Sequence, residues 1–250
     1  MLDKIAGPTE AEVSKILLKN YQKKGVDFKL SCKVTGVGTD CVTYEEKGET
    51  KSVSADKVLL SIGRRAFTAD LGLETIGVYT ERGAIVTDEY MRTNVSGVYA
   101  TGDVNGKSML AHTAYRESEV AVNHILGKKD RMRYNAIPAV IYTNPEVACV
   151  GETEESAKAK GMDIQVANVS MKFSGRYVAE VDNGDGICKL IVDKKYNRLV
   201  GCHMIGSYCS EMIYGAAMMI ETEMRIEDIK EIVFPHPTVS EIIREALFEL

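Results

Sequence analysis

The chain has 250 residues, of which 45% are hydrophobic and 27% charged, an ordinary composition for a globular protein with one large or two small domains. A formal net charge of −5 argues against nucleic acid or an anionic membrane as the main partner, because both favour basic surfaces. No apolar run approaches the roughly 20 residues that a membrane span needs, and "MLDKIAGPTE" lacks the apolar core of a signal peptide. We therefore expect a cytoplasmic protein that binds neither nucleic acid nor membrane.

The first 65 residues predict an α/β unit. In "PTEAEVSKILLKNYQKKG" apolar residues recur at helical spacing, Thr9 and Glu12 resemble a capping box, and Gly25 ends the helix. Strand-like runs follow, in the order "VDFKLSCKVTGV", "CVTYEE", "TKSVSA" and "DKVLLSIG". The last run is apolar on both faces, which predicts a buried parallel strand.

The middle of the chain begins with an irregular stretch, residues 66–96. "GVYATGDV" then predicts a short buried strand ending in Gly-Asp, and "MLAHTAYRESEVAVNHILG" predicts a helix. The charged segment "GKKDRMRYN", residues 127–135, is a candidate domain boundary.

The remainder predicts an α+β module, since strands come first and helices follow. The expected strands are "AVIYTNPEVACVG", "IQVANVSMKF" and the hairpin "CKLIVDKKYNRLVGCHMIG". The expected helices are "SEMIYGAAMMIETE", "RIEDIKEIV" and "TVSEIIREALFEL".

The six cysteines include no C-x-x-C pair and no zinc-like spacing. We expect them to be small buried hydrophobic residues in a reducing compartment, and we expect no metal site.

Two short motifs could approach a ligand. In "ATGDV", Gly102 permits close backbone approach and Asp103 could accept from a ribose or polyol hydroxyl, although Gly-Asp also forms ordinary turns. The helix start at "MLAH" could face a ring carbonyl or phosphate, with His112 either facing the ligand or purely structural. In "LLSIGRR", Gly63 could lie against a cofactor, whereas the two arginines that follow are as compatible with simple solvation.

"FPHPTVSEIIREAL" carries the strongest candidate for chemistry. Thr238 and Glu241 fit a capping box, which would leave His236 as a loop residue. The alternative is that Glu241 bonds one nitrogen of the His236 ring, fixes its tautomer and leaves the other nitrogen as a general base. The residue types alone leave both interpretations open.

The motifs "SIGRR", "GVYATGDV", "MLAHTAYRE", "YTNPEVACVGETE" and "HPTVSEIIREA", in this order, resemble the pyridine nucleotide–disulfide oxidoreductases. Within this family they are more similar to the dihydrolipoamide dehydrogenases than to glutathione or mercuric reductases. The resemblance implies an α/β plus α+β fold: the end of a Rossmann-like nicotinamide domain (residues 1–65), a returning flavin-domain segment (66–133) and an α+β dimerisation domain (134–250).

The resemblance also assigns roles to individual residues. It implies that His236 is the acid/base and that Glu241 is its orienting partner. It also implies a cis peptide bond between His236 and Pro237. The residues implied to contact FAD are Asp103, Met109, Leu110, Ala111 and His112, and those implied to contact NAD are Val34 and Gly63.

The implied reaction is oxidation of a protein-bound dihydrolipoyl group, with FAD and NAD as cofactors. The implied partners are a second copy of the chain, bound through residues 134–250, and the lipoyl protein of a 2-oxoacid dehydrogenase or glycine cleavage complex. The sequence contains no G-x-G-x-x-G loop and no C-x-x-x-x-C pair, so Met1 resembles an internal methionine of a longer protein. We therefore expect the chain to be inactive alone; the alternatives are a non-catalytic dimerisation module or one half of a split enzyme.

Overall fold

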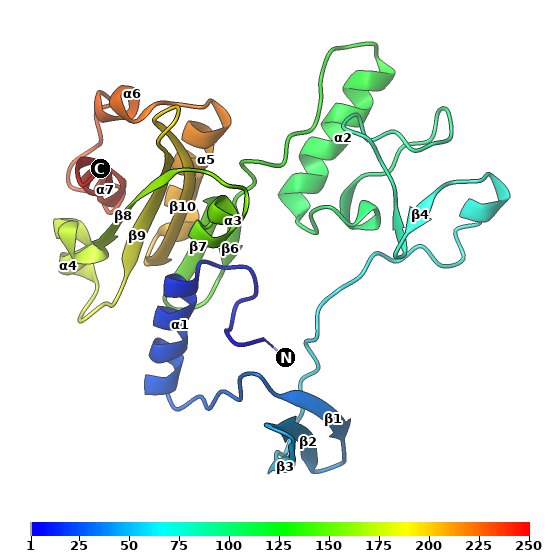
Figure 1. Ribbon diagram of the computed structural model, residues 1–250, viewed down its shortest axis with the longest axis horizontal. Helices are drawn as coiled ribbons and strands as arrows, with labels where there is room; N and C mark the ends of the chain where they lie inside the picture. The colour runs from blue at the N-terminus through cyan, green and yellow to red at the C-terminus, as the bar shows by residue number, and fades with distance from the viewer. Residues whose placement is uncertain (1) are drawn as a thin grey trace. The chain divides into compact units, whose positions relative to one another are not determined.

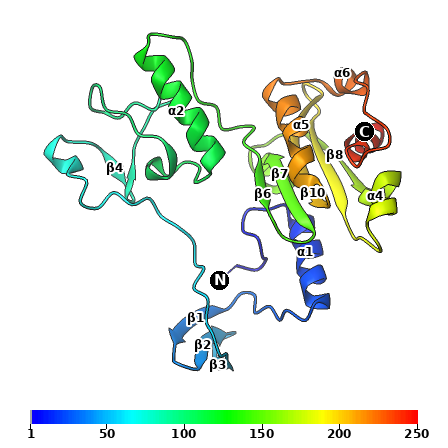
Figure 2. The ribbon, with the colours of Figure 1, turned by 180° about the vertical axis from the view of Figure 1, so that it is seen from behind.

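A computed structural model describes residues 2–250, so Met1 lies outside the described residues. Two compact units form: Met1–Val58 together with Asn135–Leu250, and Leu59–Tyr134 (Figures 1 and 2). Within the described residues, no helix is both long and apolar enough to cross a membrane.

The first unit begins with a helix and a small antiparallel sheet. These elements are α1 (Ala11–Lys23), β1 (Lys33–Val37), β2 (Cys41–Glu46) and β3 (Glu49–Ser54), with strand order β1-β2-β3. The expected helix and the first three expected strands are confirmed, but the capping box is wrong. Glu10 is the N-cap of α1 and makes no side-chain cap, while the Thr9 hydroxyl donates to the carbonyl of Ala6.

A five-stranded antiparallel sheet dominates the rest of this unit, in the order β6-β7-β10-β9-β8. Its strands are β6 (Ala139–Ile141), β7 (Glu146–Gly151), β8 (Ile164–Ser170), β9 (Ile187–Asp193) and β10 (Arg198–Gly206). The C-terminal α+β module is thus confirmed, and the expected hairpin is β9–β10.

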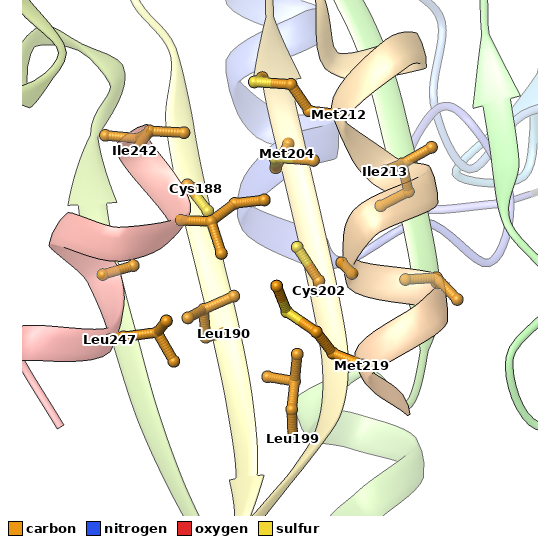
Figure 3. Close-up of a cluster of buried hydrophobic side chains, with 14 of the residues drawn as sticks. Cys188, Leu190, Leu199, Cys202, Met204, Met212, Ile213, Met219, Ile242 and Leu247 are labelled. Atoms are coloured by element: carbon orange, nitrogen blue, oxygen red, sulfur yellow. The ribbon is translucent and has the colours of Figure 1, made fainter. Parts of the chain in front are cut away.

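Helices α5 (Cys209–Glu221), α6 (Ile226–Lys230) and α7 (Glu241–Phe248) contribute to one core with this sheet. Figure 3 shows side chains of α5 and α7 meeting those of β9 and β10 in this core. Cys188 and Cys202 lie within it as buried free thiols, as expected, whereas Cys32, Cys41 and Cys149 are only partly buried.

The opposite face of the sheet packs against α1. Val13 and Leu17 of the helix form a second apolar cluster with Val147 and Ile205 of β7 and β10. The alternation of side chains along each strand explains why one sheet has two cores. Three short helical elements of this unit were not expected: α3 (Glu154–Ala159), η3 (Met171–Phe173) and α4 (Gly175–Glu180).

The second unit contains one long helix and little regular sheet. Its elements are η1 (Leu73–Thr75), the hairpin β4 (Thr80–Glu81) and β5 (Ala84–Ile85), η2 (Gly102–Asn105) and α2 (Ala111–Ile125). The expected helix is confirmed as α2.

Both buried strands expected near this unit are wrong. "DKVLLSIG" forms no strand, and the side chains of Leu59 and Ile62 are 90% and 86% exposed. "GVYATGDV" makes only an isolated bridge between Tyr99 and Arg92. An apolar run becomes a buried strand only beside partner strands, and within residues 2–250 no strand pairs with residues 56–63.

Candidate active site

His236 and Glu241 form a hydrogen-bonded pair at the start of α7. Nδ1 of His236 lies 2.8 Å from Oε1 of Glu241. The His236 side chain is 80% exposed, while that of Glu241 is 19% exposed. Among the residues that the structure describes, Nε2 of His236 has no hydrogen-bond partner, so it is the nitrogen available for proton transfer.

The packing of α7 holds Glu241 in place. Ile242, Ile243, Ala246 and Leu247 are buried in the core with the sheet, directly after the carboxylate. The second carboxylate oxygen of Glu241 accepts from the backbone N–H of Thr238 at 2.8 Å.

Only half of the expected capping box is therefore formed. The N-cap of α7 is Ser240, and the Thr238 hydroxyl turns back to the carbonyl of Pro235. The expected cis His236–Pro237 bond is present.

Ser174 fixes the other side of this loop, and sequence reasoning missed it. Its buried hydroxyl donates to the carbonyl of Thr238 at 3.0 Å and accepts from the N–H of Tyr177 as the N-cap of α4. A serine before the run "GRYVAE" is an N-cap signal and could have revealed the helix start. Its contact with a loop 64 residues away could not be predicted from local pattern.

The electrostatics of the pair favour a carboxylate at residue 241. The Thr238 amide and the His236 ring hold the pKa of Glu241 below its usual range. A carboxylate on Nδ1 fixes the imidazole tautomer and stabilises the ring when it is protonated. The pair can therefore accept and return a proton at Nε2.

A second group of candidate residues surrounds the Gly-Asp turn of the other unit. Glu117 of α2 is completely buried, and its Oε2 accepts from the N–H of Gly102 at 2.6 Å and from Asn105 at 2.8 Å. Its Oε1 accepts from the Tyr134 hydroxyl at 2.7 Å. Burial and this bond to Glu117 raise the pKa of Tyr134 above its usual range.

Sequence reasoning missed Glu117 as well, although a signal was present. Its position falls on the stripe of α2 that also buries Thr113, Val120 and Ala121, and a carboxylate on a buried stripe requires hydrogen-bond donors.

The turn that Glu117 fixes presents Asp103 to solvent. Asp103 is exposed, and among residues 2–250 its carboxylate has no hydrogen-bond or ion-pair partner. Met109 and Leu110 precede α2, while Ala111 and His112 open it. Leu110, the N-cap, makes no side-chain cap, and the first turn of α2 carries the positive end of the helix dipole.

These residues fit the polyol chain and ring of a flavin. A free carboxylate suits the hydroxyls of the chain, and an uncapped helix N-terminus suits an electron-rich ring edge. The sequence contains no glycine-rich G-x-G-x-x-G loop, which is the motif that usually binds the phosphates of a flavin dinucleotide.

The two residues expected to contact NAD belong to different units. Val34 lies on β1, with its side chain 62% exposed, in the first unit. Gly63 lies in the second unit with φ of 102°, in the exposed segment that forms no strand. Among residues 2–250, no group of three or more His, Cys, Asp or Glu side chains could hold a metal ion.

Comparison with known proteins gives a consistent result. Profiles of the pyridine nucleotide-disulphide oxidoreductases match residues 1–118, and the dimerisation domain of the same family matches residues 137–247. The mitochondrial dihydrolipoyl dehydrogenase of Pisum sativum is 39% identical over 95% of this chain and 48% of its own length. The dihydrolipoyl dehydrogenase of Bacillus subtilis is 38% identical over 98% of this chain and 53% of its own length.

Solved structures show the same fold. LpdA from Mycobacterium tuberculosis superposes with a TM-score of 0.88 at 24% identity, covering 99% of this chain and 55% of that one. The HOCl-induced flavoprotein disulfide reductase RclA from Escherichia coli, in its Cu(II) complex, gives a TM-score of 0.86 at 25% identity, covering 100% of this chain and 57% of that one. The chain thus spans about half the length of the relatives it matches.

Proposed function

The chain belongs to the pyridine nucleotide-disulphide oxidoreductase family, and from that premise we propose that it supplies the proton-transfer site of a dihydrolipoyl dehydrogenase. The observation that carries the proposal is the 2.8 Å contact between Nδ1 of His236 and Glu241 on a packed helix, with Nε2 left free.

In the proposed reaction, Nε2 of His236 takes a proton from a thiol of the dihydrolipoyl group. The resulting thiolate is the nucleophile for a redox disulfide, which the sequence of this chain does not encode as a C-x-x-x-x-C pair. Glu241 keeps the ring oriented and stabilises its protonated form.

The electrons and protons balance with FAD and NAD as cofactors. The dithiol loses two electrons and two protons and becomes the disulfide lipoyl group. When bound, FAD and NAD⁺ would supply the electron-transfer chemistry, taking up the two electrons and one proton, while the second proton would be released to solvent. In this proposal Asp103 and residues 109–112 would bind and orient the flavin, and Val34 and Gly63 would each contact NAD from its own unit.

The proposed domain limits are residues 1–65 for the nicotinamide part, 66–133 for the flavin part and 134–250 for dimerisation. The proposed partners are a second copy of the chain and the lipoyl protein of a 2-oxoacid dehydrogenase or glycine cleavage complex, in the cytoplasm. We propose that the chain alone is inactive. The experiment described next tests this proposal together with the split-enzyme and non-catalytic alternatives.

The experiment combines this chain with a second polypeptide that carries the front half of the Bacillus subtilis relative. NADH formation from dihydrolipoamide and NAD⁺ is followed by its near-ultraviolet absorbance, and flavin binding by visible absorption. We expect turnover only with both chains present. His236→Gln should then lower kcat by about 100-fold or more, the usual contribution of a general base.

Glu245→Gln is the matched control for Glu241→Gln, because Glu245 lies on the same helix and makes only an exposed ion pair with Arg244. We expect Glu241→Gln to slow turnover and Glu245→Gln to leave it unchanged. Full activity of His236→Gln would contradict the assigned base. The absence of turnover with both chains present would favour the non-catalytic module.

A further inference from the structure

A basic cleft lies at the C-terminal end of α2, away from the residues assigned above. Its volume is about 680 Å³, and all of its lining residues belong to the unit Leu59–Tyr134. The lining consists of Tyr90, Arg92, His124, Gly127, Lys128, Lys129, Asp130 and Arg131. Cavities of roughly 300–1,000 Å³ are the size class that accommodates small organic ligands.

The charge of the cleft is strongly positive in a chain whose formal net charge is −5. Four of its lining side chains are cationic, and Asp130 is the single carboxylate among them. Arg116 and Asn123 bond Asp130 and lower its pKa to about 2, so this carboxylate is already paired.

Three of the cationic side chains have no ion-pair partner among residues 2–250 and can bind an anion: Lys128, Lys129 and Arg131. Each is exposed, and within the described part of the chain no carboxylate lies at ion-pair distance from any of them. The N–H groups of Gly127 and Lys128 bond the carbonyls of His124 and Asn123. These hydrogen bonds fix the backbone at the C-terminal end of α2, from which the lysine side chains extend. They also satisfy two helix-end carbonyls that would otherwise repel an anion.

Aromatic rings line the same cleft. The ring centroids of Tyr90 and His124 lie 5.2 Å apart, and the guanidinium of Arg92 lies 5.1 Å from the centre of the Tyr90 ring. Arg92 also pairs with Asp88, and the Tyr99 hydroxyl lies 2.8 Å from Nδ1 of His124. These contacts hold the aromatic wall in one arrangement.

We propose that this cleft binds a nucleoside polyphosphate. Lys128, Lys129 and Arg131 pair with the phosphate groups, since ammonium and guanidinium groups are the usual partners of phosphate. Tyr90 and His124 contact the planar base, because aromatic side chains stack on bases with little dependence on base identity.

The test is titration calorimetry of the full chain with ATP, with tripolyphosphate and with adenosine, at low ionic strength. We expect ATP to bind more tightly than either of the other two. Lys128→Gln/Lys129→Gln should weaken ATP binding roughly tenfold, because two charge-assisted contacts are lost. Tyr90→Leu should weaken ATP binding and leave tripolyphosphate binding unchanged.

Lys15→Gln/Lys19→Gln is the matched control, as it removes the same charge from exposed positions of α1 and should leave ATP binding unchanged. Equal affinity for ATP in the Lys128→Gln/Lys129→Gln variant would overturn the site. Tripolyphosphate binding as tightly as ATP, with no effect of Tyr90→Leu, would overturn the assignment to a nucleotide.

Discussion

Glu117 shows how much one buried side chain organises in the smaller unit. Three donors meet its carboxylate, from Gly102, Asn105 and Tyr134, and its side chain has no exposed surface. The turn that presents Asp103 therefore depends on a residue 14 positions further along the chain, which itself touches no proposed ligand.

Replacing Glu117 by Gln places an amide NH₂ opposite one of those donors. We expect the free energy of unfolding to fall by about 1–3 kcal/mol, the usual cost of an unsatisfied buried group. Loss of the negative charge should also lower the pKa of Tyr134, whose bond to Glu117 helps to raise it. Denaturant titration measures the first effect, and the absorbance of the tyrosinate measures the second.

Glu119→Gln is the control on the same helix, because Glu119 forms only an exposed pair with Arg116. That variant should differ from the parent by less than about 0.5 kcal/mol. Equal stability of both variants would show that Glu117 does not organise the turn.

At the scale of elements, a buried charge cluster joins α1 to the five-stranded sheet. Lys189 of β9 has a side chain only 5% exposed and lies 3.0 Å from Glu10 and 3.1 Å from Glu12. Glu154 at the start of α3 also contacts it. Burial lowers the pKa of Lys189, but hydrogen bonds to these carboxylates outweigh burial and raise it above the usual lysine value.

Lys189→Met should release α1 from the sheet. Removing the cation leaves the carboxylate of Glu10, 6% exposed, with the Glu154 N–H but without a balancing charge, and breaking a buried ion pair in this way costs about 3–5 kcal/mol. We expect faster hydrogen exchange at the amides of α1, while the amides of β9 and β10 keep their protection.

Two further variants make this prediction specific. Lys194→Met removes an exposed lysine paired with Asp163 and should change exchange little. Glu10→Leu combined with Lys189→Met should restore much of the protection, since apolar pairs often replace buried ion pairs without loss. Unchanged exchange in Lys189→Met would contradict the role of the cluster.

At the scale of the whole molecule, the segment matched as a dimerisation domain exposes several large apolar side chains. They are Tyr142, Phe173, Val178, Tyr214, Met218, Ile232 and Val233. Exposed apolar groups on a matched dimerisation domain are what a partner surface would cover.

We therefore expect a dimer in sedimentation velocity at micromolar concentration. Tyr214→Asp/Met218→Asp, on one exposed face of α5, should shift the protein to a monomer while circular dichroism stays unchanged. Lys195→Asp, in the exposed β9–β10 turn, should leave the dimer intact. A monomer for the parent chain at tens of micromolar would contradict the proposed homodimer.

The local sequence pattern was sufficient to predict the helices and strands whose hydrogen bonds join residues close together in the chain. Apolar residues at helical spacing predicted α1, because that period aligns one apolar face, and the runs "MLAHTAYRESEVAVNHILG" and "CVTYEE" predicted α2 and β2. The prediction of a buried strand at residues 56–63 was wrong because a strand depends on distant parts of the chain. An apolar run becomes a strand only when partner strands satisfy its backbone hydrogen bonds.

The candidate active site also has features that the sequence predicts and features that depend on the tertiary structure. The sequence alone determined that His236 and Glu241 stand five positions apart before an amphipathic helix, and it contained the motifs that carry the family resemblance. Only the tertiary structure decided that Glu241 bonds the His236 ring as well as the Thr238 amide, that Ser174 holds the loop, and that Lys189 and Glu117 gather their partners. These contacts join residues distant along the chain, and burial and hydrogen bonding between such residues depend on the packed fold.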